Sequence, residues 1–184
     1  MYRTSAPVPK KGFTLIEVMV VISIIGILVS ILVLSFDQAR KHSRDSARKA
    51  ALKQLQLAIE TYKAQNGVYP PQGCGTVGTQ WAGPGPISAS WGASCSQYIT
   101  GVTPDFIAVL PTDPNQENVD NVGMLYRTDA TQQAYKLLSH ADVETDYVTS
   151  FSDEFARCPS AVGACAASLQ NNVYAVYSKG AESW

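Results

Sequence analysis

The longest hydrophobic run in the chain extends over residues 13–36 and contains one ionisable side chain, that of Glu17. As an α-helix, a segment of this length would reach ~36 Å, enough to cross a hydrocarbon layer of ~30 Å. Val and Ile are abundant in it, but the run is far longer than a strand. A cleaved secretory signal would have a shorter apolar core followed by a small-residue cleavage site, and residues 37–40 offer none. The pattern therefore predicts a membrane-spanning helix.

Helix-forming residues continue from position 37 to position 66 without a proline. The first glycine after them is Gly67, and glycine directly after a helix is a common stop. Large apolar side chains in this segment recur at spacings that place them on one helix face: Leu52, Leu55, Ile59 and Tyr62. We predict an amphipathic continuation of the helix over 37–66, whose apolar stripe packs against the protein's own head rather than against a partner.

Residues 67–184 are numerous enough for a globular head with a modest core. Up to position 96 they are rich in Gly, Pro, Ser and Trp, which indicates loops rather than a second domain. Three later segments have the composition of strands: 123–127, 134–138 and 173–178. The sequence therefore predicts an α+β fold, in which a long N-terminal helix with a membrane half and an amphipathic half packs against a small antiparallel β-sheet.

The start of the apolar run carries a specific motif. Residues 11–19 read KGFTLIEVM, with a basic residue, Gly12, Phe13, Thr-Leu, and Glu17 at the fifth position after the glycine. This motif, followed by an apolar helix, resembles the N-terminal signature of the type IV pilin superfamily. That superfamily includes type IV pilins, competence pilins and the pseudopilins of type II secretion.

The resemblance implies a leader peptide, residues 1–12, which a prepilin peptidase removes by cutting between Gly12 and Phe13. The peptidase would also methylate the new amino group of Phe13. Glu17 would be the family's buried acid, which pairs with the Phe13 amine of a neighbouring subunit during filament assembly. Opposite charges in a low-dielectric bundle stabilise each other only when they are placed together, so this pair would set the register of the subunits.

The partners implied by the resemblance are other pilin subunits, the prepilin peptidase, an inner-membrane assembly platform and the lipid bilayer. The chain would cross the inner membrane once with a cytoplasmic N-terminus, and would enter a cell-surface or periplasmic filament after assembly. The three positive charges of residues 1–12 favour this orientation, whereas the basic stretch 40–53 opposes it. We follow the leader, because the cleavage site must face the cytoplasm.

One position departs from the family pattern. Many members carry a proline at the position of Leu34, where the N-terminal helix bends, and proline would remove a helix hydrogen bond. The remaining weak points of the helix are Gly26, Ser23 and Ser30. The sequence leaves open whether the helix curves gently or melts locally around Gly26 in a filament.

The net charge of −1 hides four blocks of alternating sign. Residues 1–12 carry +3, residues 13–36 carry −1, residues 37–53 carry +4 and residues 54–184 carry −7. Near-neutrality argues against a general nucleic-acid binder, and the basic stretch has no interleaved aromatic residues. Its side chains could contact lipid phosphates or acidic surfaces of neighbouring subunits, or form a solvated helix face. A basic stalk below an acidic head is a polarity that stacked subunits could use.

Four cysteines lie in the predicted extracytoplasmic head, and an even number there suggests disulfides. None has the C-x-x-C spacing of a zinc site or a redox motif. Of the three pairings, we favour Cys74 with Cys95 and Cys158 with Cys165, because each closes a loop that contains Gly, Pro or Ser and no strong regular element. Each bond would add ~2–4 kcal/mol by limiting the unfolded chain. Reduced, buried thiols are the alternative.

One polar stretch of the head looks at first like a calcium loop: Asp113, Asn115, Glu117 and Asp120. It has Asn118 where an EF-hand needs glycine and Met124 where it needs glutamate, so it is not an EF-hand. Major pseudopilins bind calcium in a head loop, and by this resemblance calcium is a weak candidate; no other cofactor is expected. A second acidic cluster carries similar weight: Asp142, Glu144 and Asp146. We interpret both as solvated acidic loops.

No catalytic motif is present in the sequence, which has no G-x-S-x-G, no H-E-x-x-H and no phosphate-binding glycine loop. We therefore do not expect an enzyme. His42 lies on the basic stretch, and His140, after a predicted strand, is interpreted as a surface residue. Trp81 and Trp91 are interpreted as anchors of their loop rather than as ligand contacts.

These observations predict a structural subunit of a type IV pilus or a pilus-like filament, used for adhesion, motility or surface contact. The loop-rich head and its cysteines favour a pilus subunit, whereas the L-P-x-D-P stretch at 110–114 favours a major pseudopilin of a type II secretion system. A minor or competence pilin is a third role. The alternative from another class is a membrane-anchored binding domain that never polymerises, and such a tether needs neither Gly12 nor Glu17.

Overall fold

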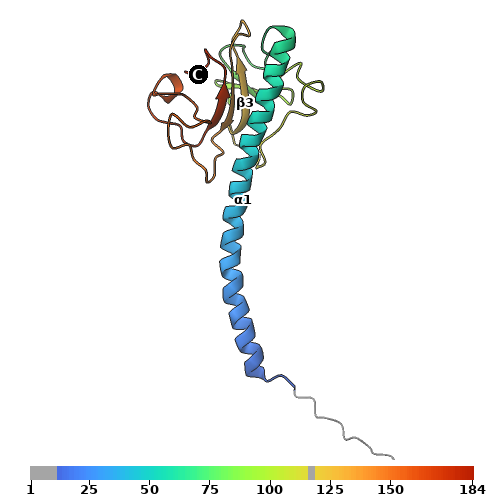
Figure 1. Cartoon of the computed structure of the whole chain (residues 1–184), viewed down its shortest axis with the longest axis vertical. Helices are drawn as coiled ribbons and strands as arrows, with labels where there is room; N and C mark the ends of the chain where they lie inside the picture. The colour runs from blue at the N-terminus through green and yellow to red at the C-terminus, as the bar shows by residue number, and fades with distance from the viewer. Residues whose placement is uncertain (1–11, 116–118) are drawn as a thin grey trace, which may run out of the picture. The chain divides into compact units, whose positions relative to one another are not determined.

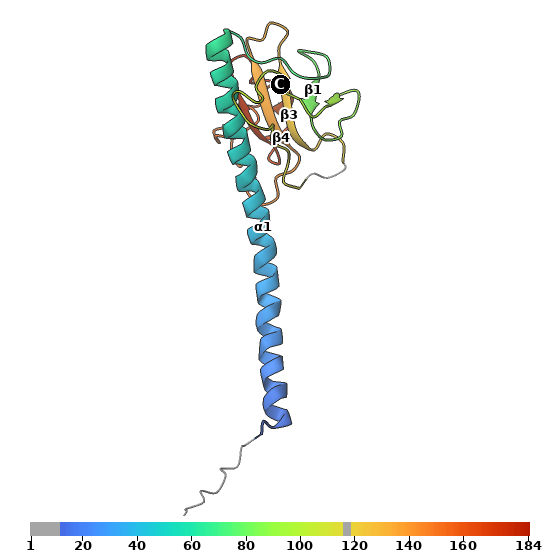
Figure 2. The same cartoon turned by 90° about the vertical axis from the view of Figure 1, so that its right-hand side faces the viewer.

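The computed structural model describes residues 12–115 and 119–184 (Figures 1 and 2). Its long helix α1 (Leu15–Asn66) precedes a five-stranded sheet and a short 3-10 helix, η1 (Gly163–Cys165). The chain forms two compact units, divided inside α1 between Ala39 and Arg40. The first unit contains the apolar part of α1, and the second contains the amphipathic part of α1 with the head. The predicted α+β class is confirmed.

Helix α1 ends where the sequence predicts. The residue after Asn66 is Gly67, whose φ of 81° lies in the left-handed region that glycine adopts without steric penalty. Its amide donates a hydrogen bond of 2.8 Å to the carbonyl oxygen of Lys63, which is the αL form of a helix C-cap. At its other weak point, Gly26, the helix is unbroken in the single chain.

The sheet has the strand order β2-β1-β3-β4-β5. Its strands are β1 (Trp81–Gly83), β2 (Gly92–Ser94), β3 (Gly123–Thr128), β4 (Tyr135–His140) and β5 (Tyr174–Tyr177). Only the β1–β2 pair is parallel, and the other three pairs are antiparallel. Strands β3, β4 and β5 correspond to the three predicted strands, with ends that differ by one or two residues.

The short strands β1 and β2 lie in the segment that the sequence analysis interprets as loop, and that interpretation is wrong for these six residues. Glycine occurs there for close packing. A Cβ atom added to Gly92 would lie 2.2 Å from the carbonyl oxygen of Trp81, and one added to Gly83 would lie 2.6 Å from that of Met124. The glycines that make the segment resemble a loop are therefore what lets its strands approach their neighbours.

Both faces of the sheet are covered. Alternate strand residues point to opposite faces, and we call the face toward α1 the inner face. It packs with Leu52, Leu55 and Ile59 of α1 into the main core, and its large side chains are Met124, Tyr126, Tyr135, Leu137, Tyr174 and Val176. The opposite, outer face carries a second cluster: Trp81, Leu125, Leu138, Val173 and Ala175. The stripe on α1 thus packs against the protein's own head, as the sequence predicts.

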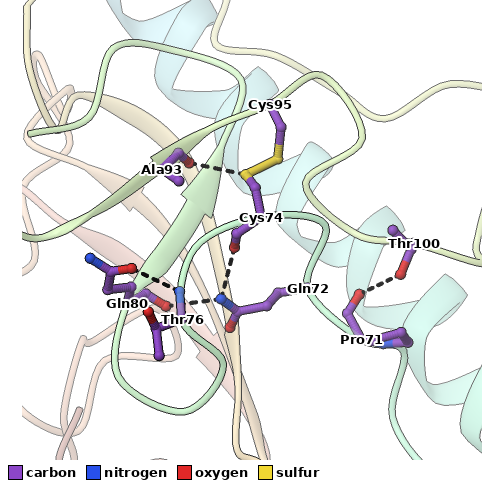
Figure 3. Close-up of a disulfide and its surroundings, with 8 residues drawn as sticks. All are labelled: Pro71, Gln72, Cys74, Thr76, Gln80, Ala93, Cys95 and Thr100. Carbon is purple, nitrogen blue, oxygen red and sulfur yellow. Dashed lines mark hydrogen bonds between the residues drawn. A yellow bond between two sulfur atoms is a disulfide. The ribbon is translucent and has the colours of Figure 1, made fainter. Parts of the chain in front are cut away.

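Two disulfides link the loops of the head, Cys74–Cys95 and Cys158–Cys165, which are the pairings that the sequence analysis favours. Figure 3 shows the first of them beside β2, with the Sγ atom of Cys74 3.2 Å from the carbonyl oxygen of Ala93. The side-chain amide of Gln72 donates a 2.8 Å hydrogen bond from Nε2 to the carbonyl oxygen of Cys74. The region before β1 is thus held by a covalent link and by side-chain hydrogen bonds to its backbone.

The contribution of the helix stripe can be measured with two leucines of α1. Leu55 is fully buried, whereas Leu57 is 70% exposed. We expect Leu55→Ala to lower the free energy of unfolding of the head by ~2–5 kcal/mol, because it leaves a cavity in the main core. Leu57→Ala should change it by less than ~0.5 kcal/mol. Urea unfolding of the full chain in detergent, followed by circular dichroism, would measure both, and equal losses would contradict the packing described here.

Candidate functional site

The predicted cleavage site lies at the start of the described chain. Phe13 is 90% exposed and Gly12 is exposed too, so the peptide bond between them is open to another protein. The rest of the predicted leader, residues 1–11, lies outside the described residues. The first helical residue is Leu15, so two exposed residues, Phe13 and Thr14, separate the leader from the helix.

Glu17 and Thr14 form a reciprocal cap at the N-terminus of α1. The amide and the hydroxyl of Thr14 donate hydrogen bonds of 2.7 and 2.6 Å to Oε2 of Glu17. The amide of Glu17 donates to the hydroxyl oxygen of Thr14 at 3.3 Å. This is the capping box S/T-x-x-E, which satisfies amides that the first helical turn leaves unpaired. The sequence analysis assigns Glu17 to assembly and misses the cap, although Thr-Leu-Ile-Glu is its signature.

The first unit exposes an apolar surface. None of the apolar window of α1 is buried in the described chain, and most of its Val, Ile and Leu side chains are more than half exposed. By length and composition this is a helix that could cross a membrane. Its serines add no free polar groups, because the hydroxyls of Ser23, Ser30 and Ser35 donate to the carbonyl oxygens of Met19, Ile27 and Ile31. Such internal pairing is what an apolar environment demands of polar groups.

In the second unit, the carboxylate of Asp45 on α1 binds the backbone of the head. It accepts hydrogen bonds from three successive amides, those of Glu144 (3.1 Å), Thr145 (2.8 Å) and Asp146 (3.1 Å). The Thr145 hydroxyl donates a fourth bond of 3.0 Å. Asp45 is fully buried, so these bonds replace the water that the carboxylate loses.

Arg48, one turn after Asp45, is the centre of an ion cluster. Its Nε and Nη2 atoms donate to the two carboxylate oxygens of Asp113 at 2.7 and 2.9 Å, the bidentate geometry that suits a guanidinium. Its Nη1 atom donates to Asp45 at 2.8 Å and to Glu144 at 3.0 Å, and Asp142 lies 3.6 Å from Nε. Arg48 is 1% exposed, so four carboxylates surround one buried guanidinium. We call these five residues the Arg48 cluster.

The cluster holds its carboxyl groups in different protonation environments. Burial raises the pKa of Asp45, but the hydrogen bonds from the amides of residues 144–146 outweigh it and leave that pKa below its ordinary value. Burial also raises the pKa of Asp113, and the bonds from Arg48 outweigh it. For Asp142 the balance is reversed, because burial and then the neighbouring Asp113 carboxylate raise its pKa above the ordinary value.

Three more pairs continue the contact along α1, of which the first is half-buried and the other two are more exposed: Arg44 with Glu144, Lys49 with Asp146 and Lys53 with Glu154. The ammonium of Lys49 also lies 4.7 Å from the centre of the Tyr174 ring. Exposed pairs of this kind contribute little each, ~0–1 kcal/mol. The free energy that joins helix to head therefore comes mainly from the Arg48 cluster and the apolar core.

These contacts correct two interpretations. Four of the residues interpreted as parts of solvated acidic loops lie against α1 instead: Asp113 and Asp142 are buried, and Glu144 and Asp146 are ion-paired with residues of α1. Much of the basic stretch is likewise paired within the same chain, and so is not the free surface that stacked subunits could use. Sequence reasoning identified both charge blocks but had no signal that they meet, because about 100 residues separate Arg44 from Glu144.

The calcium candidates do not converge in the described chain. Asp113 binds Arg48, Asn115 and Asp120 are exposed, and Glu117 lies outside the described residues. Among residues 12–115 and 119–184, no three His, Cys, Asp or Glu side chains are grouped as metal ligands would be. Calcium binding stays a prediction.

The two histidines differ. His42 is exposed on α1. His140, interpreted as a surface residue, is half-buried instead: its ring lies 4.7 Å from that of Trp91, and its Nδ1 atom is 2.6 Å from the carbonyl oxygen of Asn121. Trp81 is buried and Trp91 half-buried, as expected of loop anchors.

Comparison with known proteins gives the meaning of the N-terminal geometry. Residues 9–33 match the family described as the prokaryotic N-terminal methylation motif, which includes the exposed Gly12–Phe13 bond, the capped Glu17 and the apolar helix. The chain is thus similar to proteins of the type IV pilin and pseudopilin superfamily. Members of this superfamily are structural subunits rather than enzymes.

Three curated relatives of this superfamily share the N-terminal region. The type II secretion system core protein G of Pseudomonas aeruginosa is 36% identical over 61 residues, which are 33% of this chain and 43% of that protein. The type IV major pilin protein PilA of Myxococcus xanthus is 39% identical over 59 residues, 32% of this chain and 27% of that protein. The type IV wide pilus major component PilA4 of Thermus thermophilus is 41% identical over 59 residues, 32% of this chain and 45% of that protein.

These matches span less than half the length of each relative and about a third of this chain. No solved structure matches the chain. The similarity to known proteins is therefore limited to about a third of the chain, and the family motif to residues 9–33.

The raised pKa of Asp142 predicts a pH effect that one substitution isolates. A group whose pKa is higher in the folded chain stabilises the fold below its ordinary pKa, and that stabilisation is lost as the pH rises. Asp142→Asn mimics the neutral form. Between about pH 4, near the ordinary pKa of an aspartate, and about pH 8, to which burial raises the pKa of Asp142, its free energy of unfolding should therefore rise relative to that of the natural chain.

The control for this measurement is Asp146→Asn, in the same loop but with a carboxylate that is 48% exposed and paired with Lys49. Urea unfolding at several pH values would give both differences. A difference for Asp142→Asn that stays constant with pH would show that Asp142 is ionised in the folded chain.

Proposed function

We propose that the chain is a structural subunit of a type IV pilus, held in the inner membrane by α1 with its N-terminus in the cytoplasm and assembled from there into a filament. The observation that carries this proposal is the apolar part of α1, which none of the described residues buries and much of which belongs to the methylation motif. A surface of that size needs lipid before assembly and other subunits after it.

Maturation removes residues 1–12 and leaves Phe13 as the N-terminal residue with a methylated amine. The prepilin peptidase supplies both steps, and the exposed Gly12–Phe13 bond supports access. In the single chain the Glu17 carboxylate is bound by Thr14. In the filament it pairs with the Phe13 amine of a neighbour, so Glu17 is held ready in the cap until an opposite charge arrives in the apolar bundle.

The second candidate is a major pseudopilin of a type II secretion system, favoured by the match to core protein G of Pseudomonas aeruginosa and by the L-P-x-D-P stretch. In the structure the aspartate of that stretch, Asp113, serves the Arg48 cluster. The two disulfides and the loop-rich head favour the pilus. Deleting the gene separates the two roles: loss of surface filaments supports a pilus subunit, and loss of secreted enzymes from the medium supports a pseudopilin.

Maturation is checked by the mass of the N-terminal peptide of the protein purified from membranes. We expect a peptide that begins with methylated Phe13. Gly12→Val places a branched side chain at the cut site, and this variant should retain the leader while its head folds normally. An intact leader in the natural mature protein would instead support a simple membrane tether.

The role of Glu17 is tested by two substitutions that separate its charge from its cap. Glu17→Ala removes both, and Glu17→Gln keeps a hydrogen-bond acceptor for Thr14 but no charge. We expect both variants to insert into the membrane at normal levels and both to lose filaments, measured as subunit in the sheared surface fraction. Normal filaments in Glu17→Gln would show that the cap alone is needed.

A further inference from the structure

The outer face of the sheet carries an excess of buried positive charge. Arg127 of β3 lies opposite Lys136 of β4, which lies opposite Tyr177 of β5, so the two bases share one row across the sheet. Arg157 lies in the segment that runs beside β5, where the amide of Ala175 donates to the carbonyl oxygen of Phe155. Burial, and to a lesser extent the charge of Arg157, lowers the pKa of Lys136 and of His140, two residues of the outer face of β4.

Arg157 is buried without a partner. It is 7% exposed, and its Nε atom is enclosed and has no hydrogen-bond acceptor. Within residues 12–115 and 119–184, no carboxylate lies within ion-pair distance of its guanidinium and no oxygen accepts a bond from it. Arg48, on α1, is 1% exposed and has four carboxylates around it.

The neighbouring residues Lys136 and Glu182 do not neutralise the charge of Arg157. Lys136 is fully buried and donates to the backbone oxygens of Ala181 (3.2 Å), Glu182 (3.1 Å) and Trp184 (3.1 Å). Burial, and then the charge of Arg157, lowers the pKa of Lys136 to about 7. The carboxylate of Glu182 accepts the amide of Gly180 at 2.7 Å.

Arg127 repeats the pattern. Its guanidinium carbon lies 4.6 Å from the centre of the Trp184 ring and 5.7 Å from that of Trp81. Its Nη2 atom donates to the carbonyl oxygen of Gly78 at 2.6 Å, while its Nε atom, like that of Arg157, is enclosed without an acceptor. The outer face thus has two guanidinium groups whose enclosed Nε donors no described residue accepts, whereas the guanidinium of Arg48 on α1 has four carboxylates around it.

A buried guanidinium without a counter-charge is strongly unfavourable, and an apolar side chain of similar volume in its place is often better tolerated. The fork of an arginine matches the two oxygens of a carboxylate or a phosphate. We propose that Arg157 is the centre of an oxyanion-binding site on the outer face of the sheet, where it binds a carboxylate or phosphate group. The site lies in the head and does not depend on filament formation.

The ligand's oxyanion has two sources, a small soluble anion or an acidic side chain of a second copy of this chain. A soluble anion binds independently of protein concentration. A carboxylate of a second copy makes self-association depend on Arg157, and free acetate then competes with it. The measurements below distinguish these sources.

Tryptophan fluorescence is a local probe of this site, because the three tryptophans of the chain all lie at the outer face: Trp81 in the cluster, and Trp91 and Trp184 packed on it. We would titrate the full chain in non-ionic detergent with phosphate and with acetate, using chloride at matched ionic strength as the reference. The emission should change and saturate with phosphate or acetate. Sedimentation at two protein concentrations, with and without acetate, reports self-association.

Arg157→Met should raise the half-saturating anion concentration, or the concentration needed for self-association, by about tenfold or more. Arg157→Lys keeps the charge but not the fork and should have an intermediate effect. Arg40→Gln, which removes an exposed arginine of α1, is the matched control and should behave as the natural chain does. Circular dichroism and intact disulfides establish that each variant is folded.

The proposal also predicts opposite effects on stability. Without added phosphate or acetate, Arg157→Met should have an unfolding temperature equal to or above that of the natural chain. A saturating concentration of the anion should raise the unfolding temperature of the natural chain and leave that of the variant unchanged. The proposal is wrong if phosphate and acetate leave the tryptophan emission at its value in chloride and the chain does not self-associate. It is also wrong if Arg157→Met responds to the anions, or self-associates, as strongly as the natural chain does.

Discussion

The attachment of the head to α1 depends on one buried guanidinium. Arg48 binds Asp113 of one head loop and Glu144 of another, and Asp45 on the preceding turn binds the backbone of the second loop. If Arg48 were removed, buried carboxylates would lose their counter-charge, which is far more unfavourable than the loss of an exposed pair. The apolar stripe on α1 contributes buried apolar area, but the hydrophobic effect is not directional. The Arg48 cluster is therefore what fixes where along α1 the loops bind.

Much of the fold follows from sequence pattern, and the exceptions have physical reasons. The length of the apolar run, the stripe from Leu52 to Tyr62 and the glycine stop at Gly67 predict α1, because helix signals are local. Strands β3, β4 and β5 are equally visible. Strands β1 and β2 are not, because each has three residues and the glycine that its packing requires also resembles a loop.

The candidate sites divide in the same way. The Gly12–Phe13 bond and Glu17 are close in sequence, so a single local motif covers both, and residues 9–33 match the prokaryotic N-terminal methylation motif. The Arg48 cluster and the surroundings of Arg157 are assembled from residues far apart in the chain, and pairing between distant charges leaves no periodic signal. Solvation was therefore the natural interpretation of Asp113 and Asp142, and burial on folding is what overturns it.

The burial of Arg48 also determines how the head responds to its surroundings. Dissolved ions screen exposed charges over ~8–10 Å at ordinary salt, but they screen an enclosed pair much less. The ion pairs of Arg44, Lys49 and Lys53 are less enclosed and weaken as salt rises, but they contribute little to the free energy that joins the head to α1. The strength with which the head is attached to α1 should therefore stay nearly unchanged from fresh water to brine.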